Sequence, residues 1–132
     1  AIKVYSNSGE TILQLEDDGL LRSREIKVDV QTWPDYVFSD DYKLMTLEDL
    51  ALFIEKNHHL PGVPNAKSVE KNGLGLGVMQ KTQMEKIEEQ ALYSIYLNNE
   101  LKKVKKENTE LKSELDDIKS ELAEIKELLS KQ

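Results

Sequence analysis

The 132-residue sequence contains no cysteine, three prolines and only 6% aromatic residues. Without cysteine the chain has no disulfide framework, no thiolate zinc site and no cysteine nucleophile, although a secreted protein without cysteine is compatible with this composition. The chain also lacks an apolar run of the roughly 18–20 residues that a membrane span requires, and no basic, apolar leader opens it. The sequence therefore predicts no membrane span, no cofactor and no ordinary enzyme.

Basic residues are in the minority, since 18 Lys and Arg accompany 25 Asp and Glu and the formal net charge is −7. Binding to phosphates needs clustered Lys and Arg, so the composition predicts no nucleic-acid partner. Glycine and proline occur only before Val78. This change predicts three regions: residues 1–19 as a strand hairpin at the end of a β-rich shaft, residues 20–77 as a small α+β head, and residues 78–132 as a long helix. A start at Ala1, inside a strand-like run, suggests a piece of a longer chain.

Apolar residues in the C-terminal region recur at alternating spacings of three and four. With Leu101 at position a of a heptad, the a and d positions are Leu101, Val104, Asn108, Leu111, Leu115, Ile118, Leu122, Ile125 and Leu129. The g positions 100, 107, 114 and 121 are all Glu, and the e positions 105, 112, 119 and 126 are all Lys. In a parallel coiled coil a g residue faces the e residue of the next heptad on the neighbouring chain. The pattern therefore predicts a parallel homo-oligomer rather than a solvated single helix.

The heptads do not specify how many chains the oligomer contains. Leu at a with Ile at d shifts the preference away from dimers, and a buried Asn fixes the register at a cost in stability. Asn108 is therefore interpreted as a register residue and not as a ligand site. The heptads leave dimer, trimer and tetramer open.

The first 77 residues predict short strands and short helices. We expect strands over residues 2–5, 11–15 and 26–31, the last because apolar and polar residues alternate there. We expect helices over residues 47–57 and 66–72, each bounded by capping or turn residues. The fold class is therefore α+β, with a small head followed by a long C-terminal helix that forms a parallel coiled coil.

Three aromatic residues lie close together around a proline in the head. We expect Trp33, Tyr36 and Phe38 to pack the head onto the long helix, near Ile87 and Tyr93, because that stretch of helix is apolar on more than one face. This packing role is favoured over a ligand cage.

Candidate chemistry is sparse. Ser23 and Lys27 are weak candidates for catalysis, because side chains four residues apart on a straight strand are roughly 13 Å apart. His58 and His59 are adjacent, so their side chains diverge, and we expect them to cap or pack a helix end rather than to bind metal. The glycine-rich run 73–77 lacks the Lys-Ser/Thr of a phosphate loop and is interpreted as a hinge.

Several segments carry a resemblance to a known family, the most specific being Trp33-Pro34-Asp35-Tyr36-Val37-Phe38 and His59-Leu60-Pro61-Gly62, with further matches at 20–28, 63–67, 73–80, 86–89 and 92–93. Over residues 20–110 the chain resembles the C-terminal domain of many long surface and tail-fibre-like proteins of Bacteroidota. That domain is distantly similar to the endosialidase-type intramolecular chaperones at the ends of phage tail spikes. Those chaperones trimerise, nucleate folding of the β-rich shaft before them, and often cut themselves off with a Ser and a Lys.

The resemblance implies a homotrimer, an upstream β-rich shaft on the same chain, and a setting at the cell surface, outside the cell or on a phage-like particle. The cleavage motif of the chaperones has Ser-Asp, with Lys five residues after the Ser. Here Arg24 follows Ser23 and Lys27 comes four residues later, which departs from that motif.

Three hypotheses for function result. The first is a non-catalytic C-terminal oligomerisation and assembly module of an extracellular fibre, adhesin or tail-fibre-like protein. The second is a self-cleaving chaperone peptidase that uses Ser23 and Lys27. The third is a tip that binds a glycan, a surface receptor or a secretion or anchoring component through the head. Exposed aromatic residues in the assembled head would favour this hypothesis.

Overall fold

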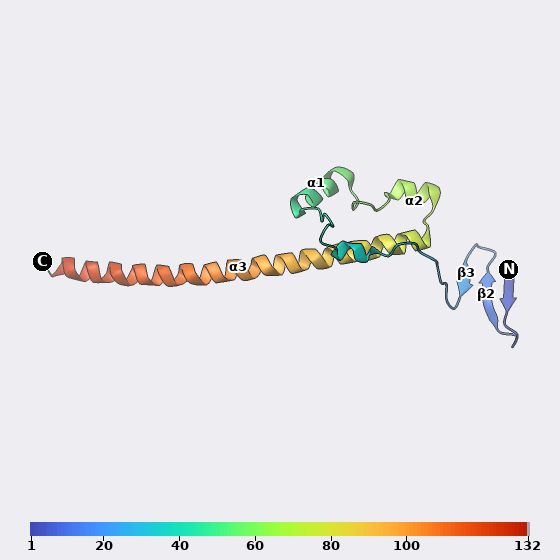
Figure 1. Ribbon diagram of the computed structural model, residues 1–132, viewed down its shortest axis with the longest axis horizontal. Coiled ribbons are helices and arrows are strands. Elements are labelled where there is room, and N and C mark those ends of the chain that lie inside the picture. Colours follow the sequence, from blue (N-terminus) through green and yellow to red (C-terminus); the bar gives the residue numbers. More distant parts are fainter. Residues whose placement is uncertain (132) are drawn as a thin grey trace.

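A small antiparallel sheet stands at one end of the molecule and a single long helix forms the rest of its length (Figure 1). The structure, a computed structural model, describes residues 1–131. In chain order its elements are β1 (Ile2–Tyr5), β2 (Thr11–Leu15), β3 (Leu21–Ser23), the 3₁₀ helix η1 (Pro34–Phe38), α1 (Leu47–Asn57), α2 (Ala66–Asn72) and α3 (Leu76–Ser130). The α+β class and the long C-terminal helix that the sequence predicts are confirmed.

The three strands pair in the order β1-β2-β3, with Leu13 of β2 opposite Ser23 of β3. The prediction of a third strand over residues 26–31 was wrong. Continued beyond Ser23, where β3 ends, the register would place Glu25 opposite Thr11, the first residue of β2, so residues 26–31 would have no residues of β2 opposite them. Alternation of apolar and polar residues alone cannot supply the missing partner.

Local capping explains where the two short helices begin and end. Thr46 accepts a hydrogen bond of 3.1 Å from the backbone N–H of Asp49, which starts α1, and Asn65 accepts one of 2.9 Å from the N–H of Ser68, which starts α2. His58 ends α1 in the left-handed conformation, with φ of 58°. Side-chain acceptors at these positions satisfy N–H groups that have no partner inside the helix.

Helix α3 begins at Leu76, two residues before the start that the sequence predicts, and its 55 residues span about 80 Å at 1.5 Å per residue. Its first turn touches the segment that follows the sheet. A Cβ atom added to Gly77 would lie 2.6 Å from Cγ1 of Val28 and 3.3 Å from Cγ2 of Val30. Gly77 therefore permits a close approach between two segments, whereas the sequence suggested only a hinge.

Burial is slight for a chain of this length. Among the described residues only Pro34 and Val37, both in η1, are buried. The 3₁₀ helix η1 lies against the first part of α3, α1 and α2 are drawn above that part, and the second half of α3 extends beyond every other element to the C-terminal end (Figure 1). Much apolar surface of the single chain is thus left uncovered.

Candidate functional site

Residues 32–45, called here the strap, run along α3 in the same direction as the helix. Four polar contacts hold it at successive points, from Lys81 near its start to Tyr93 near its end. The contacts are Lys81 Nζ to Thr32 Oγ1 (2.6 Å), Tyr36 Oη to Glu85 Oε2, Tyr42 Oη to Glu89 Oε1 (2.5 Å) and Tyr93 Oη to the carbonyl of Met45 (2.6 Å). The four α3 residues are spaced by four, so they form one stripe on the helix surface.

Hydrogen bonding and burial shift the pKa values of the strap contacts. The hydrogen bond to Glu85 and burial raise the pKa of Tyr36 to about 12. The same bond lowers the pKa of Glu85, while burial and the bond to Glu89 raise the pKa of Tyr42. Lys86 lies between the two carboxylates, 3.0 Å from Glu85 and 2.8 Å from Glu89. The network keeps both tyrosines protonated as donors and keeps Glu85 ionised as an acceptor.

The aromatic anchor predicted from the sequence lies on this strap. Tyr36 reaches α3 at Glu85, about half a turn before Ile87, and Tyr93 reaches the strap at Met45. Trp33 and Phe38 are 47% and 55% exposed, and Ile87 is 56% exposed. The buried face of η1 is instead made by its two aliphatic side chains, Pro34 and Val37.

Sequence reasoning missed the polar partners of the strap on α3. Lys81, Glu85 and Glu89 have no distinguishing neighbours along the chain, and each bonds a residue 47 to 49 positions away. The spacing of four that they share with Tyr93 was the available signal.

The a and d residues of the C-terminal heptads form a continuous stripe, called here the stalk seam, on α3. Its apolar members are between 49% and 66% exposed, and Asn108 is exposed as well. They are Leu101, Val104, Leu111, Leu115, Ile118, Leu122, Ile125 and Leu129. No other part of the described chain covers them.

Charged residues beside the stalk seam form fewer ion pairs within the chain than their number would allow, unlike several on the outer face of the helix. Ion pairs within the outer face join Lys106 to Glu110 and Lys131 to Glu127. On the flanks, only Glu100 at g and Lys119 at e take part in ion pairs, with Lys103 and Asp116. The remaining flank residues form no ion pair within residues 1–131; they are Glu107, Glu114 and Glu121 at g and Lys105, Lys112 and Lys126 at e.

The weak catalytic candidates lie at and beyond the end of β3. The hydroxyl of Ser23 donates a hydrogen bond of 2.8 Å to the carbonyl of Glu25. Lys27 is exposed in the irregular segment that follows. Of the two histidines, His58 supplies the C-cap of α1 and His59 stacks edge-on against Phe53, with ring centroids 5.7 Å apart.

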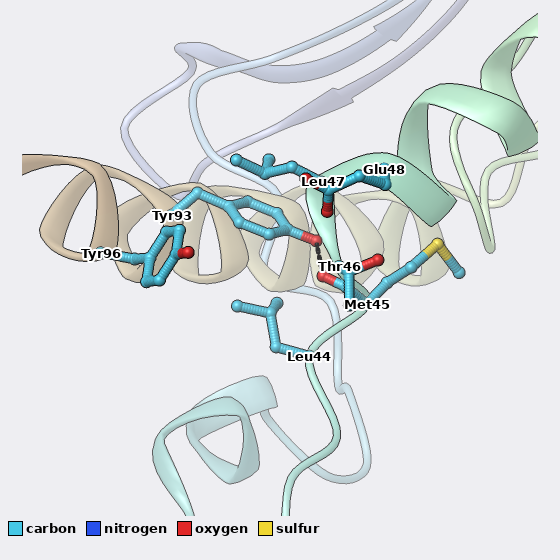
Figure 2. Close-up of a pocket in the computed structure, with 7 residues that line it drawn as sticks. All are labelled: Leu44, Met45, Thr46, Leu47, Glu48, Tyr93 and Tyr96. Atoms are coloured by element: carbon cyan, nitrogen blue, oxygen red, sulfur yellow. Dashed lines mark hydrogen bonds between the residues drawn. The ribbon is translucent and has the colours of Figure 1, made fainter. Parts of the chain in front are cut away.

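A cavity of about 300 Å³ lies between the end of the strap and α3. Figure 2 shows the Tyr93 side chain reaching Met45, with Tyr96 and two leucines beside it. The lining consists of Leu44, Met45, Thr46, Leu47, Glu48, Tyr93 and Tyr96. Among residues 1–131 no group of three metal-ligating side chains is brought together.

No protein-family model, curated protein or solved structure matches this chain. No helix in residues 1–131 is both long enough and apolar enough to cross a membrane.

Proposed function

We propose that the chain is a non-catalytic oligomerisation and assembly module, a parallel homotrimer at the C-terminal side of an extracellular fibre, adhesin or tail-fibre-like protein. The observation that carries this proposal is the exposed stalk seam. A solitary helix gains nothing from eight large apolar side chains aligned on one face, whereas a second and third copy would remove them from water.

Charge on the flanks supports pairing with copies of the same chain. Glu at g and Lys at e lack partners along most of the helix, and a parallel neighbour in register brings each pair together. Leu at a, with Ile at the d positions 118 and 125, favours an oligomer larger than a dimer, and the resemblance described above favours a trimer.

The sheet supports an upstream continuation. Apolar side chains in the strands are exposed, including Ile2 at 68% and Tyr5 at 56%. A three-stranded sheet without a covered face is marginal alone. Parallel helices hold the chain ends together, which lowers the entropy cost of pairing such strands between chains. The proposed role is therefore to align chains for assembly of a β-rich shaft.

Replacement of seam residues tests the proposal. Leu115→Asp and Ile118→Asp each place a charge at the centre of the seam and should convert the oligomer into monomers, as measured by the mass of the chain in solution. Ser113→Asp, which adds the same charge at an outer f position, should leave the oligomer intact. An oligomer that survives both seam replacements, or a monomeric wild type, would contradict the proposal.

Self-cleavage is the second candidate function, favoured by the resemblance and by an exposed Ser23 with an exposed Lys27 four residues later. It makes a separate prediction. A longer chain that includes upstream residues should be cut near Leu21–Ser23 over time, and Ser23→Ala should abolish the cut, as judged by mass spectrometry.

A recognition tip would instead require Trp33 to stay exposed in the assembled oligomer, which fluorescence quenching measures.

A further inference from the structure

The heptad register of the stalk extends into the part of α3 that carries the head. Counting back from Leu101, the a and d positions are Gln80, Gln83, Ile87, Gln90, Ser94 and Leu97. All six are exposed. Between residues 79 and 93 every other position except Ala91 is partly covered. Apart from Ala91, the exposed residues of this stretch are thus its a and d residues, and this exposed side is in register with the stalk seam.

The position of the strap explains this selective cover. Its contacts on α3 fall on Lys81, Glu85, Glu89 and Tyr93, which occupy b, f, c and g positions. Those positions lie outside the a/d stripe. The strap thus packs the head onto α3 without obstructing the side that would face a neighbouring helix.

A groove of about 400 Å³ lies along residues 86–97 of α3, on this exposed side. Its floor includes the a and d residues Ile87, Gln90, Ser94 and Leu97. One wall is formed by α1 and the loop after it, which contribute Leu47, Leu50, Leu60 and Pro61. The groove is therefore bounded by the helix on one side and by the head on the other.

We propose that residues 80–97 of α3 in a second copy of this chain pack along this exposed stripe, with side chains of its residues 87–97 entering the groove, so that the oligomer interface runs from Gln80 to Leu129. The inference rests on the proposed function. Helix α3 is unbroken, and a parallel neighbour paired at Leu101 continues alongside it at Leu97 and Ser94. Charge selects the occupant, because Glu at g and Lys at e of the adjoining stalk complement a copy of the same sequence.

The proposed interface over residues 80–97, called here the upper interface, differs chemically from the stalk. Four of its six a and d residues are polar, namely Gln80, Gln83, Gln90 and Ser94. Polar side chains at such positions can hydrogen-bond to their own copies, and they specify alignment at the expense of stability. The stalk thus supplies the attraction, and the upper interface fixes the alignment of the heads.

Single cysteines test the inference in a chain that has none of its own. Gln83→Cys and Gln90→Cys should form disulfides between chains on mild oxidation, as Ile118→Cys should in the stalk, because equivalent d residues of parallel chains approach each other. Asn99→Cys, at an exposed outer f position, is the control and should cross-link at least tenfold more slowly. Non-reducing gels report each rate.

The outcomes separate this inference from the proposed function. Cross-linking at position 118 but not at 83 or 90 would overturn the inference alone, since the helices would then diverge within the head. Absence of cross-linking at all three positions would overturn both. Equal rates at 99 and 90 would indicate random collision and would also overturn the inference. As an independent measure, Gln90→Leu should raise the melting temperature of the oligomer, and an unchanged value would contradict burial of this position.

Discussion

At the scale of single residues, Gly77 has the most constrained position in the head. The approach of Val28 leaves no room for a β-carbon there, because the two atoms would be 2.6 Å apart. Gly77→Ala should destabilise the head by about 1–3 kcal/mol, the usual cost of overpacking. Denaturant unfolding followed by the fluorescence of Trp33, the single tryptophan, measures the change at fixed protein concentration.

The control is the same substitution in a Val28→Ala background. With both methyl groups of Val28 removed, only the 3.3 Å approach of Val30 Cγ2 remains, so Gly77→Ala should cost much less or become stabilising, because alanine favours a helix over glycine by about 0.8–1 kcal/mol. An equal loss in both backgrounds would show that the close approach is not the cause.

The residue scale also marks a limit of sequence reasoning. The run from Gly73 to Gly77 reads as uniformly flexible, yet its glycines serve different purposes. Gly73 has φ of 72° and ends α2, whereas Gly77 lies inside α3 and accommodates a neighbour. A neighbour that is distant in the sequence leaves no local signal.

At the scale of elements, the hydrogen bonds that hold the strap on α3 depend on the protonation of its tyrosines. The pKa of Tyr36 is about 12 against an ordinary value of 10.0, so its bond to Glu85 stabilises the folded chain fully below pH 10. This contribution should decline as the pH rises through 12. The pKa of Glu85 is lowered, so its contribution is present above pH about 4.5 and is lost as the pH falls below that.

The variant Tyr36→Phe isolates the bond while keeping the ring. Its stability should be lower than that of the wild type near pH 7, and the difference should shrink above pH 10. Unfolding curves at several pH values provide the measurement. A difference that stays constant to pH 12 would contradict the assignment.

Elements with local signals were predicted well. Strands at 2–5 and 11–15 and helices at 47–57 and 66–72 are confirmed, because turns and caps beside them specify their ends. The strand expected at 26–31 was wrong, because its existence depends on a partner that β2 is too short to provide. The strap contacts were not predicted in residue detail, because pairs such as Tyr42 and Glu89 are related only by the tertiary fold.

At the scale of the whole molecule, the flank charges predict the orientation of the helices. A parallel arrangement sets Glu opposite Lys, whereas an antiparallel one sets Glu opposite Glu and Lys opposite Lys. Each exposed pair contributes about 0.2–1 kcal/mol, so reversal along four heptads costs a few kcal/mol. All sheets should therefore lie at the same end of the oligomer.

Spin labels at Ser130 measure this orientation. In a parallel bundle the labels should lie within about 20 Å of each other, since the helices are adjacent along their length. Separations of about 45 Å, the length of residues 101–130 at 1.5 Å per residue, would indicate antiparallel helices and contradict the assembly role.

The order of the elements along the chain has a consequence for synthesis in the cell. Ribosomes make the exposed sheet before they make α3, and at about 5–20 residues per second the stalk follows within seconds. A chain that stops before Leu101 carries the sheet but none of the stalk heptads. Under the proposed function such a truncated product cannot join its neighbours. Incompletely translated chains would therefore be left out of the assembled oligomer without the action of another protein.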